Sequence, residues 1–156
     1  MQRSTLKEKR IGSMTQKVLL TLQGMQFDQS GENADQIGTT VDGDYYKKNV
    51  KHYVLYEEVT EGFDQPTRNR LKFSEDMVEL SRSGSVNVHM VFRENKKNLT
   101  NYNTPFGQIL MGIDTKTIRV TEREERITVE VHYVLEINDE FLSDCHMKID
   151  ICAKSG

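Results

Sequence analysis

The stretch from Ser81 to Ile137 constrains the fold of this chain more than any other. Apolar residues recur at every second position through it, and short groups of turn residues separate the alternating segments. A period of two places successive side chains on opposite faces of an extended strand, so each segment is predicted to be a strand with one buried face. Several short strands at regular spacing are typical of an all-β sandwich or barrel.

The last two predicted strands, over 126–136 and 141–152, can be registered by the parity of their apolar residues. Both segments carry apolar side chains at odd positions. Because directly opposed residues share a face of the sheet, odd positions must oppose odd positions. The shortest workable register pairs Ile127 with Ile151, Val129 with Ile149 and Val131 with Met147. It leaves residues 138–140 as a loop of permitted length.

The preceding hairpin follows the same rule. Its register opposes Ile118 with Val131, Val120 with Val129, Thr121 with Thr128, and Arg119 with Glu130. The two registers together place Arg119, Glu130 and Lys148 side by side on three strands, in alternating charge order, although charge was not used to choose them. Further upstream, Thr115-Lys116 is predicted to be a turn that opposes Ile113 with Ile118 and Met111 with Val120. This succession of hairpins favours an up-and-down barrel over a Greek key.

The N-terminal half adds strands to the same domain. Residues 1–15 are rich in charge without a consistent period and are predicted to form a basic mobile tail, followed by one barrel domain over 16–153. Gly24 is a possible bulge. The segment 74–83 could start a helix at Ser74, but its alternation and its neighbours favour a strand. A chain of 156 residues is long enough for one such domain with a sizeable core.

The predicted inward-facing side chains are mostly bulky, which favours a filled or narrow barrel. They are Leu20, Leu22, Val88, Met90, Phe92, Met111, Ile113, Val120, Val129, Val131, Tyr133, Met147 and Ile149. An eight-stranded barrel is either filled by such side chains or holds one small ligand. The expected fold is therefore a single antiparallel up-and-down β-barrel.

Five short motifs, in order, resemble a known family. They are Gly43-Asp44-Tyr45-Tyr46, Tyr53-Val54-Leu55-Tyr56-Glu57-Glu58, Arg82-Ser83-Gly84, Met90-Val91-Phe92 and Tyr102-Asn103-Thr104-Pro105-Phe106-Gly107. The resemblance is to the YwiB-like family of bacterial proteins of unknown function, and it runs from about Gln16 to Ala153. It implies a calycin-like barrel, similar in shape to lipocalins, and no established activity. The family usually has Tyr where this chain has Phe106. The last motif also contains the Thr104-to-Gly107 segment, which is typical of a type I turn.

Composition narrows the classes of function. The net charge of −3 argues against a nucleic-acid-binding domain. No apolar run approaches a membrane span, and no signal peptide follows the basic start, so a cytoplasmic location without membrane association is expected. Cys145 and Cys152 are seven residues apart on one predicted strand, hence on opposite faces and too distant for a disulfide. Two free thiols fit a reducing compartment.

Neither the histidines nor the potential nucleophilic side chains of the sequence form a recognisable catalytic motif. The register opposes His132 and His146 on the outer face, where two imidazoles could hold a metal ion. The register places Val134, Asp144 and the Glu130–Lys148 pair around them, with no convergent third ligand on a rigid element, whereas catalytic zinc sites need three protein ligands. The sequence therefore predicts a solvated histidine pair, no metal and no cofactor. No Gly-rich phosphate loop, nucleophile elbow or triad pattern is present, so the protein is predicted not to be an enzyme.

Arg82 is the most informative charged residue, because it continues an apolar, inward-facing series. A buried arginine is costly unless it is paired. Glu57 continues the predicted inner face of Tyr53 and Leu55, so an Arg82–Glu57 ion pair closing one end of the barrel is one interpretation. The other is an anion site, with Arg82 gripping a carboxylate or phosphate.

The candidate ligand-binding residues are Arg82, Glu57, Tyr56, Tyr102 and Thr104. The function expected from them is non-enzymatic binding of a small apolar or anionic ligand in or at the mouth of the barrel. The alternative is a protein-interaction or structural module that uses the outer surface. Its motivation is the outer apolar set Leu19, Val91, Leu110 and Val134.

Overall fold

The computed structural model describes residues 16–24, 38–59, 64–84, 87–104 and 107–154. Ten strands account for nearly all of them: β1 (Gln16–Gln23), β2 (Gly38–Lys48), β3 (Lys51–Glu58), β4 (Thr67–Ser74), β5 (Met77–Ser83), β6 (Val88–Arg93), β7 (Lys96–Thr104), β8 (Gly107–Arg123), β9 (Arg126–Ile137) and β10 (Glu140–Ala153). The predicted mobile tail over 1–15 and the centre of the predicted turn at 104–107 lie outside the described residues. Within the described part, no helix is long and apolar enough to cross a lipid bilayer.

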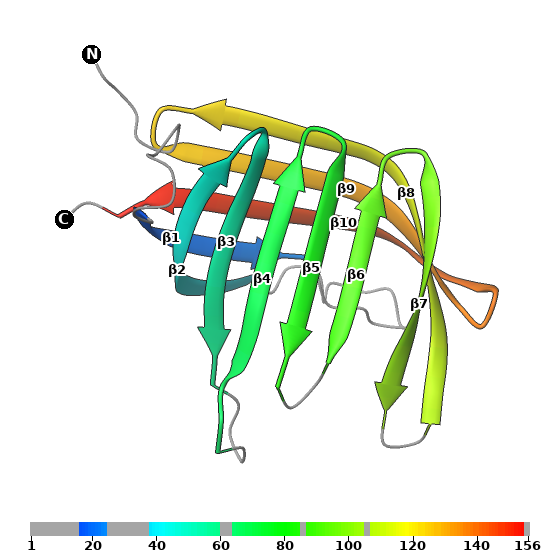
Figure 1. The fold of residues 1–156 in the computed structure, drawn as a ribbon. Coiled ribbons are helices and arrows are strands. Elements are labelled where there is room, and N and C mark those ends of the chain that lie inside the picture. Colours follow the sequence, from blue (N-terminus) through cyan, green and yellow to red (C-terminus); the bar gives the residue numbers. More distant parts are fainter. Residues whose placement is uncertain (1–15, 25–37, 60–63, 85–86, 105–106, 155–156) are drawn as a thin grey trace.

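The ten strands form one antiparallel sheet that curls into a nearly closed barrel (Figure 1). Their order is β6-β5-β4-β3-β2-β1-β10-β9-β8-β7, so each strand lies beside its neighbour in sequence and β1 pairs with β10. This confirms the up-and-down topology. Two side-chain hydrogen bonds join β6 and the turn after it to β7 and β8. Thr100 Oγ1 donates to the carbonyl of His89 at 3.0 Å, and the amide of Ile118 donates to Glu94 Oε2 at 3.2 Å.

The core lies inside the barrel and draws on nearly every strand. All thirteen residues predicted to face inward belong to it, with Val88 and Val120 only partly buried at its margin. The rings of Phe92 on β6 and Tyr133 on β9 meet edge to face, with centroids 4.9 Å apart. This contact joins two strands that are not paired with each other, which supports the prediction of a filled or narrow interior.

The registers predicted for β8, β9 and β10 are confirmed over most of their length. Ile127 opposes Ile151 and Val129 opposes Ile149. The β9–β10 loop differs from the prediction, because it contains only Asn138 and Asp139. Both have positive φ (49° and 69°), as a tight two-residue hairpin turn requires. A register shift between residues 141 and 143 then restores the predicted parity.

The predicted turn at Thr115-Lys116 is wrong. Strand β8 continues through both residues, and Thr115 is fully buried. The partner of the first half of β8 is β7, with Asn98 opposite Ile113, and not the second half of β8 itself. The pairing of β8 with β9 shifts between residues 115 and 117, which leaves Lys116 as the extra residue of a β-bulge.

Residues 77–83 form β5, as the alternation favoured, and a turn at residues 75–76 separates this strand from Ser74, the last residue of β4. Gly24 does not form a bulge; it follows the last residue of β1 with a φ of +79°. A Cβ atom there would lie 2.0 Å from the carbonyl oxygen of His146, so only glycine allows this close approach of β1 to β10.

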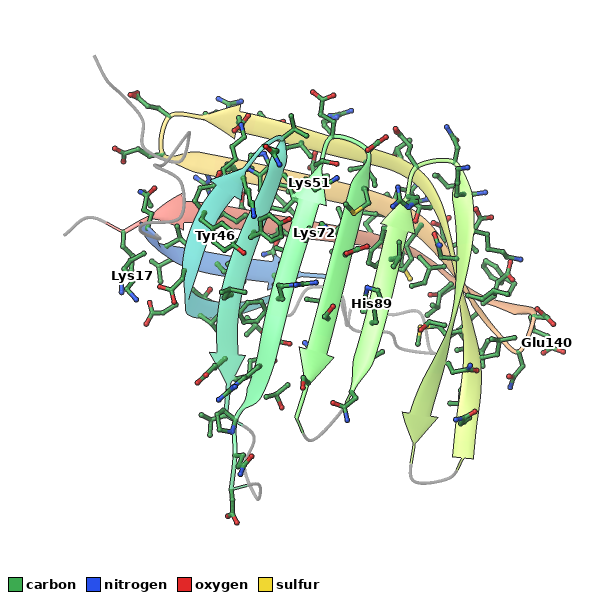
Figure 2. The ribbon with its side chains drawn as sticks, in the orientation of Figure 1. Lys17, Tyr46, Lys51, Lys72, His89 and Glu140 are labelled. Carbon is green, nitrogen blue, oxygen red and sulfur yellow. The ribbon has the colours of Figure 1, made fainter. Side chains whose placement is uncertain are left out.

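The inward phase of β3 is shifted by one residue from the prediction. His52, Val54 and Tyr56 are buried, whereas Leu55 is exposed. The hairpin at Asn49 sets this phase by pairing Lys48 with Lys51. The rings of Tyr46 and Tyr53 consequently stack outside the barrel, 4.7 Å apart, beside Lys72 (Figure 2).

Candidate functional site

A polar cluster occupies the inner face where β3, β4 and β5 lie side by side. Tyr56 on β3 opposes Asn69 on β4, and Asn69 opposes Arg82 on β5, so three polar side chains form one row across the sheet. Glu58 follows two residues after Tyr56 and so lies on the same face. We call Tyr56, Glu58, Asn69 and Arg82 the inner polar cluster.

The predicted pairing of Arg82 with Glu57 is wrong, because the phase of β3 places Glu57 on the outer surface. There Glu57 Oε2 lies 3.7 Å from Nε of Arg68, another exposed residue. Arg82 pairs instead with Glu58, with 3.5 Å between Nη2 and Oε1. Asn69 Nδ2 donates to the same Glu58 oxygen at 3.2 Å. The prediction that Arg82 faces inward beside a carboxylate holds, with the neighbouring glutamate as partner.

The inner polar cluster has unused hydrogen-bonding capacity. Among the described residues, Tyr56 Oη, Asn69 Oδ1 and Arg82 Nε are buried atoms without a hydrogen-bond partner. A buried polar group without a partner costs free energy, so such groups are normally satisfied in native proteins. Three of them on adjacent strands mark a place where a polar ligand group or bound water would be stabilised.

The electrostatics keep the Tyr56 hydroxyl protonated. Burial raises the pKa of Tyr56 to about 12, the Glu58 charge adds to this rise, and the nearby Arg82 guanidinium opposes it through both its charge and a hydrogen-bonding contribution to the phenol. The phenol is therefore a neutral group near pH 7 that can donate one hydrogen bond and accept others. Together with Arg82 Nε it supplies two donors for an acceptor-rich ligand.

Two further predicted site residues, Tyr102 and Thr104, lie on β7 with their backbones opposite Ile109 and Gly107. Their side chains lie outside the described part, so their role in ligand binding stays a prediction. Sequence reasoning missed Glu58 and Asn69. The sequence carries a signal for Asn69, because it occupies the same alternating series as Thr67, Leu71 and Phe73. The structure buries all four residues of this series.

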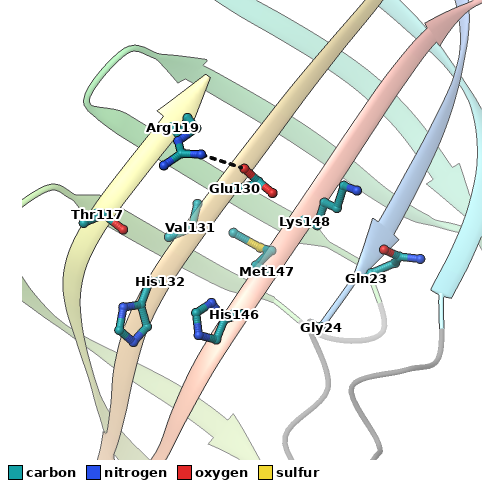
Figure 3. A pocket seen from close by; sticks show the side chains of 10 residues that line it. All are labelled: Gln23, Gly24, Thr117, Arg119, Glu130, Val131, His132, His146, Met147 and Lys148. Atoms are coloured by element: carbon teal, nitrogen blue, oxygen red, sulfur yellow. Dashed lines mark ion pairs between the residues drawn. The ribbon is translucent and has the colours of Figure 1, made fainter. Parts of the chain in front are cut away.

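The predicted histidine pair is confirmed on the outer face. His132 opposes His146, and their rings stack with centroids 4.4 Å apart. A hollow of about 460 Å³ lies beside them (Figure 3). The outer apolar residue Leu19 is 39% exposed, whereas Val91, Leu110 and Val134 are only partly exposed.

Comparison with known proteins assigns the chain to a family. Residues 20–149 match the model of the domain of unknown function DUF1934. The chain belongs to the DUF1934 family. Within the curated proteins, it is 28% identical over 128 residues to the uncharacterised β-barrel protein YwiB of Bacillus subtilis (strain 168), covering 81% of this chain and 88% of that protein.

The crystal structure of ywiB protein from Bacillus subtilis has the same fold as this DUF1934 chain. The two superpose with a TM-score of 0.72 at 23% identity, over 90% of this chain and 94% of the other. The expected membership of the YwiB-like family and the expected all-β barrel are both confirmed. Membership of DUF1934 is consistent with the observed architecture but does not specify an activity, so function must be argued from the site.

Proposed function

We propose that this DUF1934 barrel is a non-enzymatic binding protein for a small ligand with an anionic end group. The end group would lie at the inner polar cluster, near Arg82. The observation that carries the proposal is the set of three buried polar atoms without partners on β3, β4 and β5. A fold that leaves such atoms unpaired gains stability when a ligand supplies the missing hydrogen bonds.

The unpaired atoms favour a particular kind of end group. Arg82 Nε and the Tyr56 hydroxyl offer donors, which suit a carboxylate or phosphate oxygen. Asn69 Oδ1 is an acceptor and suits a hydroxyl or amine next to that anion. Within the described part of the chain, Arg82 makes one ion pair, with 3.5 Å between Nη2 and Glu58 Oε1, so further donors of the guanidinium are available to an anion.

The rest of the ligand would contact apolar side chains. Val88 lies directly opposite Arg82 on β6 and is only partly buried. Val54 on β3 and Leu71 on β4 lie on the same inner face as the cluster, each two residues along its strand from a cluster residue. Val54 and Leu71 are already fully buried, so a short hydrocarbon body would remove from water only its own surface and the exposed part of Val88, with a gain of about 25 cal/mol per Å² buried.

Native mass spectrometry tests this function. The intact protein is mixed with an equimolar panel of small carboxylates and phosphates, and any one-to-one adduct is identified by mass. We expect an adduct that survives in Arg70→Gln, which removes an exposed outer arginine, and disappears in Arg82→Gln. Equal binding by both variants would contradict the proposal.

The alternative function, recognition of a macromolecule by the outer surface, is favoured by a second hollow of about 840 Å³ over β2–β5. Asp42, Asp44, Glu57, Arg68 and Arg70 contribute charge of both signs to its wall, and Leu55 is 38% exposed beside them. Cross-linking of the protein in cell extract, compared with Arg70→Glu, tests this alternative. Loss of a specific adduct in the variant would support it, and identical adduct patterns would count against it.

A further inference from the structure

Three potential metal ligands converge on the outer face of β9 and β10. His132 Nε2 lies 2.6 Å from Asp144 Oδ1, and the imidazoles of His132 and His146 are stacked with their planes 2° apart. One donor atom from each of these three side chains lies within 4.8 Å of the other two. The sequence register places Asp144 near the two histidines without predicting that it converges with them; the structure shows that its carboxylate reaches His132.

The backbone explains why these side chains stay together. Asp144 and His146 are two residues apart on β10, so both project from the same face. His132 lies directly across from His146 on β9, at the separation of about 4.5–5.5 Å between Cβ atoms that opposed residues have. Both strands are paired on each side, β9 with β8 and β10 with β1, which holds the three attachment points in place.

A hollow beside the three residues leaves room for further ligands of an ion. His132 and His146 line it together with Gly24 and Thr117 (Figure 3). Thr117 is opposite His132 on β8, and the end of β1 approaches the backbone of His146. Because Gly24 has no side chain, nothing projects from that position over the neighbouring imidazole.

We propose that His132, Asp144 and His146 form a binding site for a divalent transition-metal ion such as Zn²⁺. Two imidazoles and one carboxylate are a donor set that zinc uses in proteins, with bonds of about 2.0–2.2 Å. Imidazole nitrogen also selects against Mg²⁺ and Ca²⁺, which prefer oxygen ligands. Three protein ligands leave at least one coordination position, and it would face the hollow.

Binding requires only side-chain movement. Donor atoms around a tetrahedral ion with such bonds lie about 3.4 Å apart, so the two stacked imidazoles must tilt toward each other. The ion replaces the hydrogen-bonded proton between His132 and Asp144. All three side chains are partly or fully exposed, so this rotation disturbs no core packing. The proposal is independent of ligand binding at the inner polar cluster.

Calorimetric titration of the full-length protein with Zn²⁺, after removal of any affinity tag, tests the proposal. We expect one ion per chain. His146→Ala and Asp144→Asn should each weaken binding by at least about tenfold, since even the loss of an outer-shell partner commonly costs that much. His89→Ala is the matched control, because His89 is exposed and lies 4.0 Å from a glutamate but has no second histidine opposite it.

A spectroscopic measurement shows where the ion binds. The imidazole proton resonances of His132 and His146 should shift together on adding one equivalent of Zn²⁺, while those of His89 stay in place. Cys152→Ser should bind as wild type does, which separates this site from thiol coordination. Absence of stoichiometric binding, or equal weakening by His89→Ala and His146→Ala, would overturn the proposal.

Discussion

Arg119 and Glu130 lie directly opposite each other on β8 and β9, with 4.0 Å between Nη1 and Oε1 (Figure 3). Lys148 occupies the next position in the same row, on β10. The alternating charges expected from the apolar register are thus present on the outer face. Exposed pairs of this kind contribute about 0–1 kcal/mol each and weaken with salt.

Replacement of Glu130 by Gln should therefore lower the free energy of unfolding by at most about 1 kcal/mol. Urea unfolding at low and high salt measures the effect, which should shrink as salt rises. Glu140→Gln, at the first residue of β10, serves as the exposed control. A loss of several kcal/mol, insensitive to salt, would show that Glu130 has a structural role other than this ladder.

Gly24→Ala should destabilise the barrel through a backbone clash. The added Cβ would lie 2.0 Å from the carbonyl oxygen of His146, and the positive φ adds strain. Gly107→Ala isolates the second effect, because Gly107 also has positive φ but no atom of the other described residues beyond its chain neighbours lies within 4 Å of its Cβ position. The strain alone costs about 1–2 kcal/mol. Chemical unfolding should show a larger loss for Gly24→Ala, and equal losses would contradict the close approach.

Burial of the imidazole, opposed by Glu122 and aided by Lys47, lowers the pKa of His52 from 6.5 to about 4. His52 is neutral in the barrel, where Nδ1 lies 2.9 Å from the Tyr45 hydroxyl and its ring stacks on Phe73. Below pH 6.5 the imidazole of His52 binds a proton in the unfolded chain, whereas in the folded protein it stays neutral until the pH approaches 4. The resulting stability is fully present above pH 6.5 and is lost as the pH falls toward about 4.

The loss between these two pH values should amount to about 2–3 kcal/mol at most. Urea unfolding across this range should show a smaller decline in His52→Gln than in the wild type. His89→Gln, at an exposed histidine, should retain the full decline. A wild-type stability that does not change between pH 6.5 and 4.5 would be inconsistent with a buried neutral His52.

The two thiols should react at different rates. Cys145 is buried, and that burial raises the pKa of its thiol, whereas Cys152 is partly exposed. Thiolate is the reactive form, so a disulfide reagent should modify Cys152 first and Cys145 only after local opening. Single variants Cys145→Ser and Cys152→Ser allow each rate to be measured. Equal, rapid labelling of both would show that the phase of β10 is wrong.

The C-terminal sheet was predictable because its apolar residues occupy one parity only. Between Ile127 and Leu135 every odd position is buried, so a slip of one residue would expose the whole set. Strand β3 lacks this property, since Tyr53, Val54, Leu55 and Tyr56 are all apolar or aromatic. Its phase depends on the turn at Asn49 and on pairing with β2, which the alternation does not encode.

The same limit explains the errors at the candidate site. Arg82 was correctly placed on the inner face, because it continues the series of Val78 and Leu80. Its carboxylate partner was misassigned by one residue, from Glu58 to Glu57, as a direct consequence of the phase of β3. The turn predicted at Thr115 failed for a different reason: a hydrophilic pair inside a long strand resembles a hairpin tip when the partner strand β7 is left out.

Ligand-dependent thermal stability tests the central claim, binding at Arg82, most directly. A ligand that binds only the folded barrel stabilises it by about 2.7 kcal/mol at one hundred times its Kd. Across a panel of small carboxylates and phosphates, at least one compound should raise the Tm of the wild type and of Arg70→Gln, and leave Arg82→Gln unchanged. No shift with any compound, or the same shift in Arg82→Gln, would contradict the proposed function.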